Sequence, residues 1–356
     1  MYVEARKVFK IQNKTRESNL ELLRIVAMLF IICHHLIVHS LYSAYYPVTA
    51  PTFNELLIDA SNVAFVFLNA FFVVAVNCYV LISGFYGIKP TFKKLCSLML
   101  MCVFYSLSCY LFYAIINDEF SVRDVLYSFL PFSHTRGLWF VGAYFVLFLI
   151  APLLNAAANY LNEQSIKEWI ITLIGLAVIT FYLGYMWRTG PNTDGYNVFN
   201  FLFLYMIGRF LKQYKSKWEG YKYKCLLIYT VCSVITFLLA IYIAINTNDA
   251  NKVFIAAWKY NSPFIVVGSI AFFLFFASLR IKSNLVNTLA ASTFPVYLIH
   301  ENTFIRDYLY TYFREHTDGM HYIMVIINIL LFAVCIFLLC VLVDRLRMII
   351  LPKSFK

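Results

Sequence analysis

Apolar runs recur along this chain, separated by short polar segments. Most runs are about 17 to 25 residues long, the length that a helix needs to cross a bilayer. We predict ten spans, of which the fourth, sixth and eighth are short, over residues 20–40, 62–84, 95–116, 138–155, 169–187, 198–212, 225–245, 263–279, 289–309 and 322–343. Boundaries read from hydropathy shift by several residues, so nine or eleven spans fit the same pattern.

The pattern predicts an all-α, polytopic bundle of membrane helices. Composition agrees, because 62% of the residues are hydrophobic and only 13% are charged, which excludes an ordinary chain of soluble domains. We therefore expect a basic leader over residues 1–19, a single transmembrane domain over residues 20–345 and a short tail over residues 346–356. The bilayer itself is the first expected partner.

The distribution of Lys and Arg predicts the orientation of the bundle. With the N-terminus inside, the inner segments hold 21 of the 29 Lys and Arg residues, the outer segments hold 7, and Arg24 lies within the first span. The positive-inside rule then places both termini in the cytoplasm of a plasma-membrane protein and requires an even number of spans. Anionic lipid and this rule explain the net charge of +11, so a nucleic-acid partner is not expected.

Two ionisable residues inside the first apolar run point to chemistry. Arg24 and His35 are eleven positions apart, which on a helix brings them within about 20° of one face and about 16 Å apart along the axis. Charged groups in hydrocarbon are costly, so the pair predicts a polar tunnel. His34 is displaced by about 100° from His35, and only one of the two can share the face of Arg24. We favour His35 as the catalytic residue and expect His34 to be packed or hydrogen-bonded.

Four motifs, in this order, resemble acyltransferase family 3, whose members are bacterial multi-span enzymes that O-acetylate surface glycans and related acceptors. Each is short, but together they extend over residues 20 to 300. They are Arg24 followed by ten residues and His35, Leu81-Ile-Ser-Gly-Phe-Tyr86, Gly137-Leu-Trp-Phe-Val141, and Phe294-Pro-Val-Tyr-Leu-Ile-His300.

The resemblance implies an O-acetyltransferase that takes an acetyl group from cytoplasmic acetyl-coenzyme A. The acceptor would be a hydroxyl of an envelope polysaccharide or of a lipid-linked glycan precursor. We expect no permanently bound cofactor and no metal, since the nine cysteines are scattered without ligand-like spacing. The candidate residues are His35, Arg24, His300 and Glu301 for catalysis, Arg24, Ser83, Gly84, Phe85, Lys89 and Lys93 for the donor, and Trp139 and His34 for the acceptor.

The chemistry of these residue types leaves two routes open. An imidazole near its ordinary pKa can accept a hydroxyl proton and return it to a thiolate, so His35 is either a general base or the carrier of a transient acyl group. Glu301 follows His300 directly, and adjacent residues on a helix do not face each other, so Glu301 is equally suited to polarise a histidine of another span. Arg24, Ser83 and the backbone around Gly84 are candidate donors to the oxyanion.

Each candidate also has a structural interpretation. Arg24 can extend to the headgroups, Trp139 can lie at the lipid interface, and the Ser83-Gly84 pair can allow helices to approach closely. A multi-span transporter or flippase of a sugar or small solute is the main alternative, because intramembrane Arg and His also mark carriers. Several acceptors and acyl lengths fit the sequence, and it does not predict an oligomeric state.

Overall fold

The computed structural model describes residues 17–41, 60–130, 138–218, 220–247 and 257–350, which form helices and turns but no strand. The inner helices are α1 (Ser18–His35), α3 (Ala60–Phe72), α4 (Ala75–Tyr86), α13 (Pro263–Ala277), α14 (Asn284–Ala290), α15 (Thr293–His300), α16 (Thr303–Thr317) and α17 (Tyr322–Ile350). The others are α5 (Phe92–Asn117), α6 (Val122–Ser128), α7 (Trp139–Glu163), α8 (Ile166–Ala177), α9 (Val198–Gln213), α10 (Lys215–Trp218) and α11 (Lys222–Thr247). The predicted all-α class is therefore confirmed for the described residues.

Seven helical segments of the described chain are long and apolar enough to cross a membrane. They are Ser18–Leu41, Val63–Tyr86, Phe92–Asn117, Trp139–Glu163, Ile166–Met186, Lys222–Thr247 and Tyr322–Ile350. Helix α13 is apolar but has only 15 residues, and α9 has 16. The predicted count of ten separate spans is thus not confirmed, and neither is the position of the termini relative to the membrane.

The predicted span over residues 289–309 is not one helix. The chain turns after α14, at Ala291 and Ser292, and again between α15 and α16, at Glu301 and Asn302. Pro295 lies in the first turn of α15, where the lack of an N–H costs nothing. The side chain of Asn302 accepts a hydrogen bond from the backbone N–H of Phe304 at 3.1 Å and so begins α16. The second break leaves Glu301 at a joint between two short helices.

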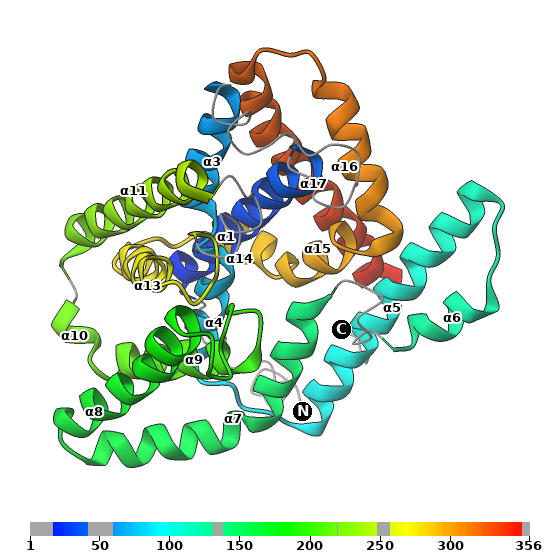
Figure 1. Ribbon diagram of the computed structural model, residues 1–356. Coiled ribbons are helices and arrows are strands. Elements are labelled where there is room, and N and C mark those ends of the chain that lie inside the picture. The colour runs from blue at the N-terminus through cyan, green and yellow to red at the C-terminus, as the bar shows by residue number, and fades with distance from the viewer. Residues whose placement is uncertain (1–16, 42–59, 131–137, 219, 248–256, 351–356) are drawn as a thin grey trace, which may run out of the picture.

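Helix α1 lies at the centre of the bundle, with α3, α4, α13, α14, α15 and α17 packed around it (Figure 1). Its first turn is anchored by Asn19, whose amide donates to the carbonyls of Phe276 and Ala277 at the end of α13, each at 3.1 Å. After His35 the helix widens into a π-helical turn, Leu36–Leu41. Such insertions change the register of the side chains and are frequent at functional sites.

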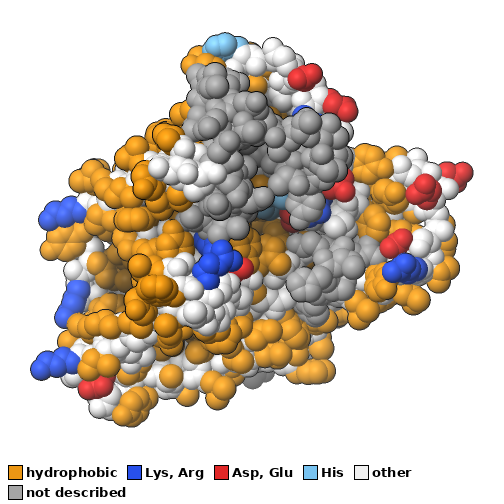
Figure 2. Space-filling view, in the orientation of Figure 1, with side chains coloured by type: hydrophobic (Ala, Val, Ile, Leu, Met, Phe, Trp, Pro, Cys, Tyr) orange, Lys and Arg blue, Asp and Glu red, His pale blue; other side chains and the backbone are white. Residues whose placement is uncertain are grey.

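Helices α7, α8 and α11 lie at the outside of the bundle. Less than a third of each membrane-length segment is buried within the protein, against 78% for Val63–Tyr86. Their exposed side chains are largely Leu, Ile, Val and aromatic residues. Hydrophobic side chains accordingly cover much of the face shown in Figure 2, with charged side chains mostly towards its margins. This surface suits contact with lipid.

Two glycines let α4 and α9 cross at backbone contact. A Cβ atom added to Gly84 would lie 2.9 Å from the Tyr205 carbonyl carbon and even closer to its oxygen. A Cβ atom added to Gly208 would lie 2.6 Å from the carbonyl oxygen of Leu81. Small residues at such a crossing allow dispersion contacts between the backbones. Gly84 therefore serves helix packing, which was the structural interpretation of the Ser83-Gly84 pair.

Replacement of Gly84 by alanine is expected to destabilise the protein by about 3 kcal/mol, because the new methyl group meets backbone atoms that cannot rotate away. Thermal unfolding in detergent measures the effect. Gly175→Ala in α8 is the matched control: nothing lies within 4 Å of its added Cβ atom, and alanine favours a helix over glycine. An equal melting temperature for the Gly84 variant and the wild type would contradict this account of the crossing.

Candidate active site

A cavity of about 340 Å³ runs along one stripe of α1. Arg24, Met28, Ile31 and His35 line it, and their spacing of four, three and four residues keeps them on one side of the helix. The cavity thus extends from the guanidinium of Arg24 to the imidazole of His35, about 16 Å along the helix axis. The structure brings these two predicted residues to one enclosed space.

The remaining walls come from α4, α5, α7, α14, α15 and the segment before α13. They combine apolar side chains with hydroxyl groups, and the residues are Val76, Tyr79, Ser83, Leu98, Trp139, Phe140, Tyr144, Tyr260, Ala290, Ala291, Thr293, Phe294 and Tyr297. Aromatic rings are concentrated opposite α1, where Trp139 and Tyr260 stack with their ring centroids 5.8 Å apart. The space is therefore mostly apolar, with a few polar groups that can orient a ligand.

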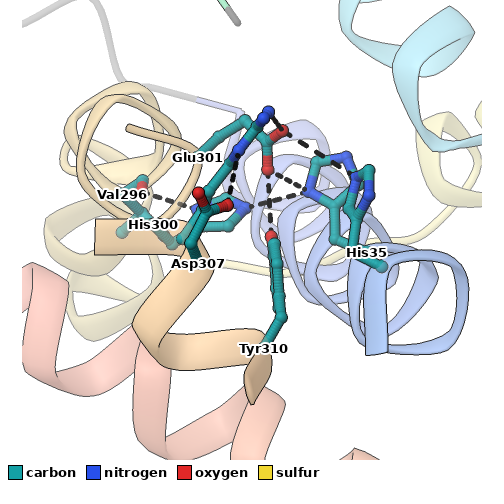
Figure 3. A network of polar contacts seen from close by, with 8 residues as sticks. His35, Val296, His300, Glu301, Asp307 and Tyr310 are labelled. Carbon is teal, nitrogen blue, oxygen red and sulfur yellow. Dashed lines mark hydrogen bonds and ion pairs between the residues drawn. The ribbon is translucent and has the colours of Figure 1, made fainter. Parts of the chain in front are cut away.

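The joint between α15 and α16 brings a carboxylate to His35 (Figure 3). The Oε2 atom of Glu301 lies 3.0 Å from Nδ1 of His35. The Nε2 atom of His300 lies 3.4 Å from the same nitrogen. Only 13% of the His35 side chain and 7% of the Glu301 side chain are exposed, so water competes little for this contact. The interaction is strengthened by its low-dielectric surroundings.

The contacts of His300 and Glu301 define which nitrogen of His35 carries hydrogen. Nδ1 of His300 lies 2.7 Å from the carbonyl oxygen of Val296, so this nitrogen is the donor and Nε2 of His300 is an acceptor. Nδ1 of His35 then faces two acceptors, a carboxylate oxygen and an imidazole nitrogen, and must donate. The lone pair of neutral His35 is consequently on Nε2, the nitrogen that remains available to a ligand.

Glu301 is held by several groups at once. The hydroxyl of Tyr310 donates to its Oε2 atom at 2.9 Å, and the guanidinium of Arg306 lies 3.4 Å from Oε1. Glu301 is outside the seven candidate spans. Burial alone would raise its pKa, but the facing imidazoles, that of His35 first and then that of His39, outweigh burial and hold the pKa of the carboxyl group well below its usual range. Glu301 is therefore ionised and able to stabilise a positive His35.

The other end of the cavity is defined by Arg24. Its guanidinium donates to both carboxylate oxygens of Glu21, at 2.8 and 2.9 Å, and 30% of the side chain is exposed. The ring of Tyr86 lies 6.0 Å away. Both contacts are made by the same nitrogen, Nη1, so they fix the direction of the guanidinium and use only part of its five N–H groups. Arg24 thus remains able to bind an anionic or carbonyl oxygen.

The other sequence-predicted residues lie in different places. Ser83 and Trp139 line the cavity, whereas Gly84 and Phe85 are buried at the crossing with α9. Lys89 and Lys93 are exposed and are not among the lining residues.

His34 points away from this site. It is 7% exposed and its Nδ1 atom lies 2.5 Å from the amide oxygen of Asn69. The rotation of about 100° between consecutive helix positions explains why only His35 reaches the cavity.

Several residues of the site were not predicted from the sequence, and four of them matter most for its chemistry. Tyr310 and Arg306 support Glu301 from α16, and Tyr260 and Tyr297 line the cavity. Tyrosine is abundant in this chain and typical of membrane interfaces, so a tyrosine in the sequence did not by itself indicate a site residue. Tyr297 lies inside the motif that ends at His300, and that position was the only available clue.

The His35, His39 and Glu301 side chains could also be metal ligands by type, since one ligand atom of each lies within 4.8 Å of the others. The contact between His35 and Glu301 at 3.0 Å and the Arg306 guanidinium on the same carboxylate account for the cluster without an ion. A metal on Nδ1 of His35 would moreover displace the hydrogen that Glu301 accepts. These residues therefore fit a proton-handling site better than a metal site.

The arrangement is that of a nucleophile-activating site. It provides a base with a defined tautomer, a buried carboxylate behind the base and a cation at the far end of the same cavity. A family model described as an acyltransferase domain matches residues 17–345. No match was found among curated proteins or among solved structures.

Proposed function

The chain belongs to this acyltransferase family, and we propose that it transfers an acetyl group from cytoplasmic acetyl-coenzyme A to a hydroxyl of an envelope polysaccharide or of a lipid-linked glycan precursor. Family membership makes the protein a membrane acyltransferase. The observation that supports the finer proposal is the continuous cavity between Arg24 and His35 within the membrane bundle. Such a passage can admit a donor at one end and an acceptor at the other.

In this proposal Nε2 of His35 removes the proton of the acceptor hydroxyl as its oxygen attacks the thioester carbonyl. The resulting imidazolium is stabilised by Glu301 at 3.0 Å. When the carbon–sulfur bond breaks, the imidazolium returns the proton to the thiolate, and the products are an ester and free coenzyme A. In the second route the same nitrogen attacks the thioester first and passes the acetyl group on.

Arg24 is assigned to the donor. A guanidinium pairs well with phosphate and with polarised carbonyl oxygens. The exposed fraction of its side chain and its distance of about 16 Å from His35 along the helix suit contact with the body of coenzyme A, while the thioester lies near the imidazole. The contact with Glu21 keeps the guanidinium in place for each donor molecule.

The test of the proposed function uses purified protein in liposomes with labelled acetyl-coenzyme A and total envelope glycan. We expect label to appear in the glycan as an alkali-labile ester. A transporter or flippase would instead move intact solute across the liposome membrane and transfer no label. Absence of labelled ester with folded wild-type protein would overturn the proposal.

The role of Arg24 can be separated from its pairing with Glu21. Loss of Arg24 alone would leave Glu21 buried without its partner, so the test variant is Glu21→Gln combined with Arg24→Gln, and Glu21→Gln alone is the control. We expect the double variant to raise the KM for acetyl-coenzyme A by roughly 10- to 100-fold, the value of a lost hydrogen bond to a charged group. The control should retain the wild-type KM, and equal KM values for both variants would contradict the assignment.

A further inference from the structure

The hydroxyl of Tyr297 is buried without a hydrogen-bond partner among the described residues. The side chain lines the cavity that His35 shares, and the residue is only 6% exposed. The backbone of Phe140 faces the hydroxyl but makes no hydrogen bond of ordinary geometry with it. Leaving such a group unpaired costs about 1–3 kcal/mol, so its presence calls for an explanation.

Other buried tyrosines of the bundle donate their hydroxyl hydrogen to a backbone carbonyl. Tyr79 donates to the carbonyl of Arg24 at 2.6 Å, and Tyr229 donates to the carbonyl of Phe71 at 2.8 Å. These hydroxyls connect helices. Within the described part of the chain, the Tyr297 hydroxyl donates to no such carbonyl, which distinguishes it from tyrosines retained for stability.

The position of Tyr297 relates it to the reacting groups. Its ring lies 6.1 Å from that of His300, which in turn lies 5.5 Å from that of His35, in each case between centroids. Across the cavity α7 begins at Trp139, and its N-cap residue Leu138 provides no side-chain acceptor for the first N–H groups. The N-terminal end of a long helix carries partial positive charge. The ring of Tyr297 also lies 5.7 Å from that of Phe140 in the first turn of α7, between centroids, so Tyr297 and this helix N-terminus line the same cavity as His35.

The other candidate oxyanion donors are less suitable. The hydroxyl of Ser83 donates to the carbonyl of Tyr79 at 2.9 Å, and Gly84 is enclosed at the crossing with α9. Arg24 is about 16 Å from His35 along α1, too far to contact the carbon that the acceptor attacks.

We propose that the Tyr297 hydroxyl, together with the N-terminus of α7, binds the thioester carbonyl oxygen and stabilises the oxyanion that forms during acyl transfer. This inference rests on the proposed function. As the acceptor oxygen bonds to the carbonyl carbon, the π electrons move to the carbonyl oxygen, which accepts a hydrogen bond from Tyr297. When the carbonyl re-forms, the thiolate leaves and takes its proton from His35. Donors placed where charge develops contribute more to the transition state than to substrate binding.

The decisive variant is Tyr297→Phe, with Tyr229→Phe as the matched control, since the two tyrosines are 6% and 5% exposed. We expect Tyr297→Phe to lower kcat about 100-fold, to leave the KM for acetyl-coenzyme A unchanged and to keep or raise the melting temperature, because an unpaired hydroxyl is removed. Tyr229→Phe should lower the melting temperature and keep kcat, because the Phe71 carbonyl loses its donor.

A second readout separates catalysis from structure. Replacement of Tyr297 by a fluorinated tyrosine makes the phenol more acidic with little change in shape, and kcat should then depend on that acidity. A wild-type kcat in Tyr297→Phe, or a fall in its melting temperature like that of Tyr229→Phe, would overturn the inference. In either case the proposed function stands as long as the wild-type protein produces labelled ester. Absence of labelled ester from the wild-type protein would overturn both the inference and the proposed function.

Discussion

Replacement of His35 by alanine is expected to lower kcat for acetyl transfer about 10⁴-fold without unfolding the protein. The variant removes the nitrogen that takes the acceptor proton in one route and the nucleophile in the other, and general bases account for effects of this size. Because the side chain faces a cavity, its truncation leaves space that water can enter. Turnover of labelled acetyl-coenzyme A and thermal unfolding are measured on the same preparation.

The control for this variant is His316→Ala, since His316 is exposed on α16 and lies outside the cavity. Its kcat should equal that of the wild type. His34→Ala provides a sharper comparison, because it should reduce stability through the lost contact with Asn69. A variant of His34 that loses turnover while His35→Ala retains it would reverse the assignment of the base.

Replacement of Glu301 by glutamine is expected to lower kcat about 10³-fold, with little change in the KM for acetyl-coenzyme A. An amide in this position can direct its NH₂ group at Nδ1 of His35, which would then have to accept and would leave hydrogen on Nε2. A base in the wrong tautomer cannot take the acceptor proton, and the imidazolium also loses its counter-ion. Steady-state kinetics over a range of pH measures both effects.

The matched control is Asp307→Asn. Asp307 bonds the same Arg306 guanidinium as Glu301, but its side chain is 72% exposed and lies away from His35. Its isosteric replacement should leave kcat unchanged, since an exposed pair contributes little. Equal losses in the two variants would show that the guanidinium network, and not the Glu301–His35 contact, determines turnover.

Local periodicity explains which features could be predicted from the sequence. Arg24 and His35 share a helix, so their common face follows from 100° per residue, and the structure places both on one cavity. The apolar runs likewise located most helices, because helix formation in a bilayer is required by backbone hydrogen bonding. Both inferences depend on neighbours along the chain.

The rest depends on how distant helices pack. Glu301 approaches His35 only because the predicted span over residues 289–309 is interrupted at Asn302, and hydropathy averaged over a span does not locate such a break. The support from Tyr310 depends on the direction in which α16 leaves that joint. Gly84 was assigned to the donor by its motif, while its backbone contact with Tyr205 could be known only once α4 and α9 were docked.

The crossing of α4 and α9 has a mechanical consequence for turnover. The backbones of α4 and α9 are in contact at Gly84 and Gly208, so the two helices cannot move relative to each other without steric clashes. The part of the cavity wall that carries Ser83 is therefore rigid. Any movement that admits a substrate or releases a product must then come from another part of the cavity wall, such as the short helices α14 and α15. A cross-link between those helices and α5 is expected to abolish turnover, whereas a cross-link between α4 and α9 should leave kcat unchanged.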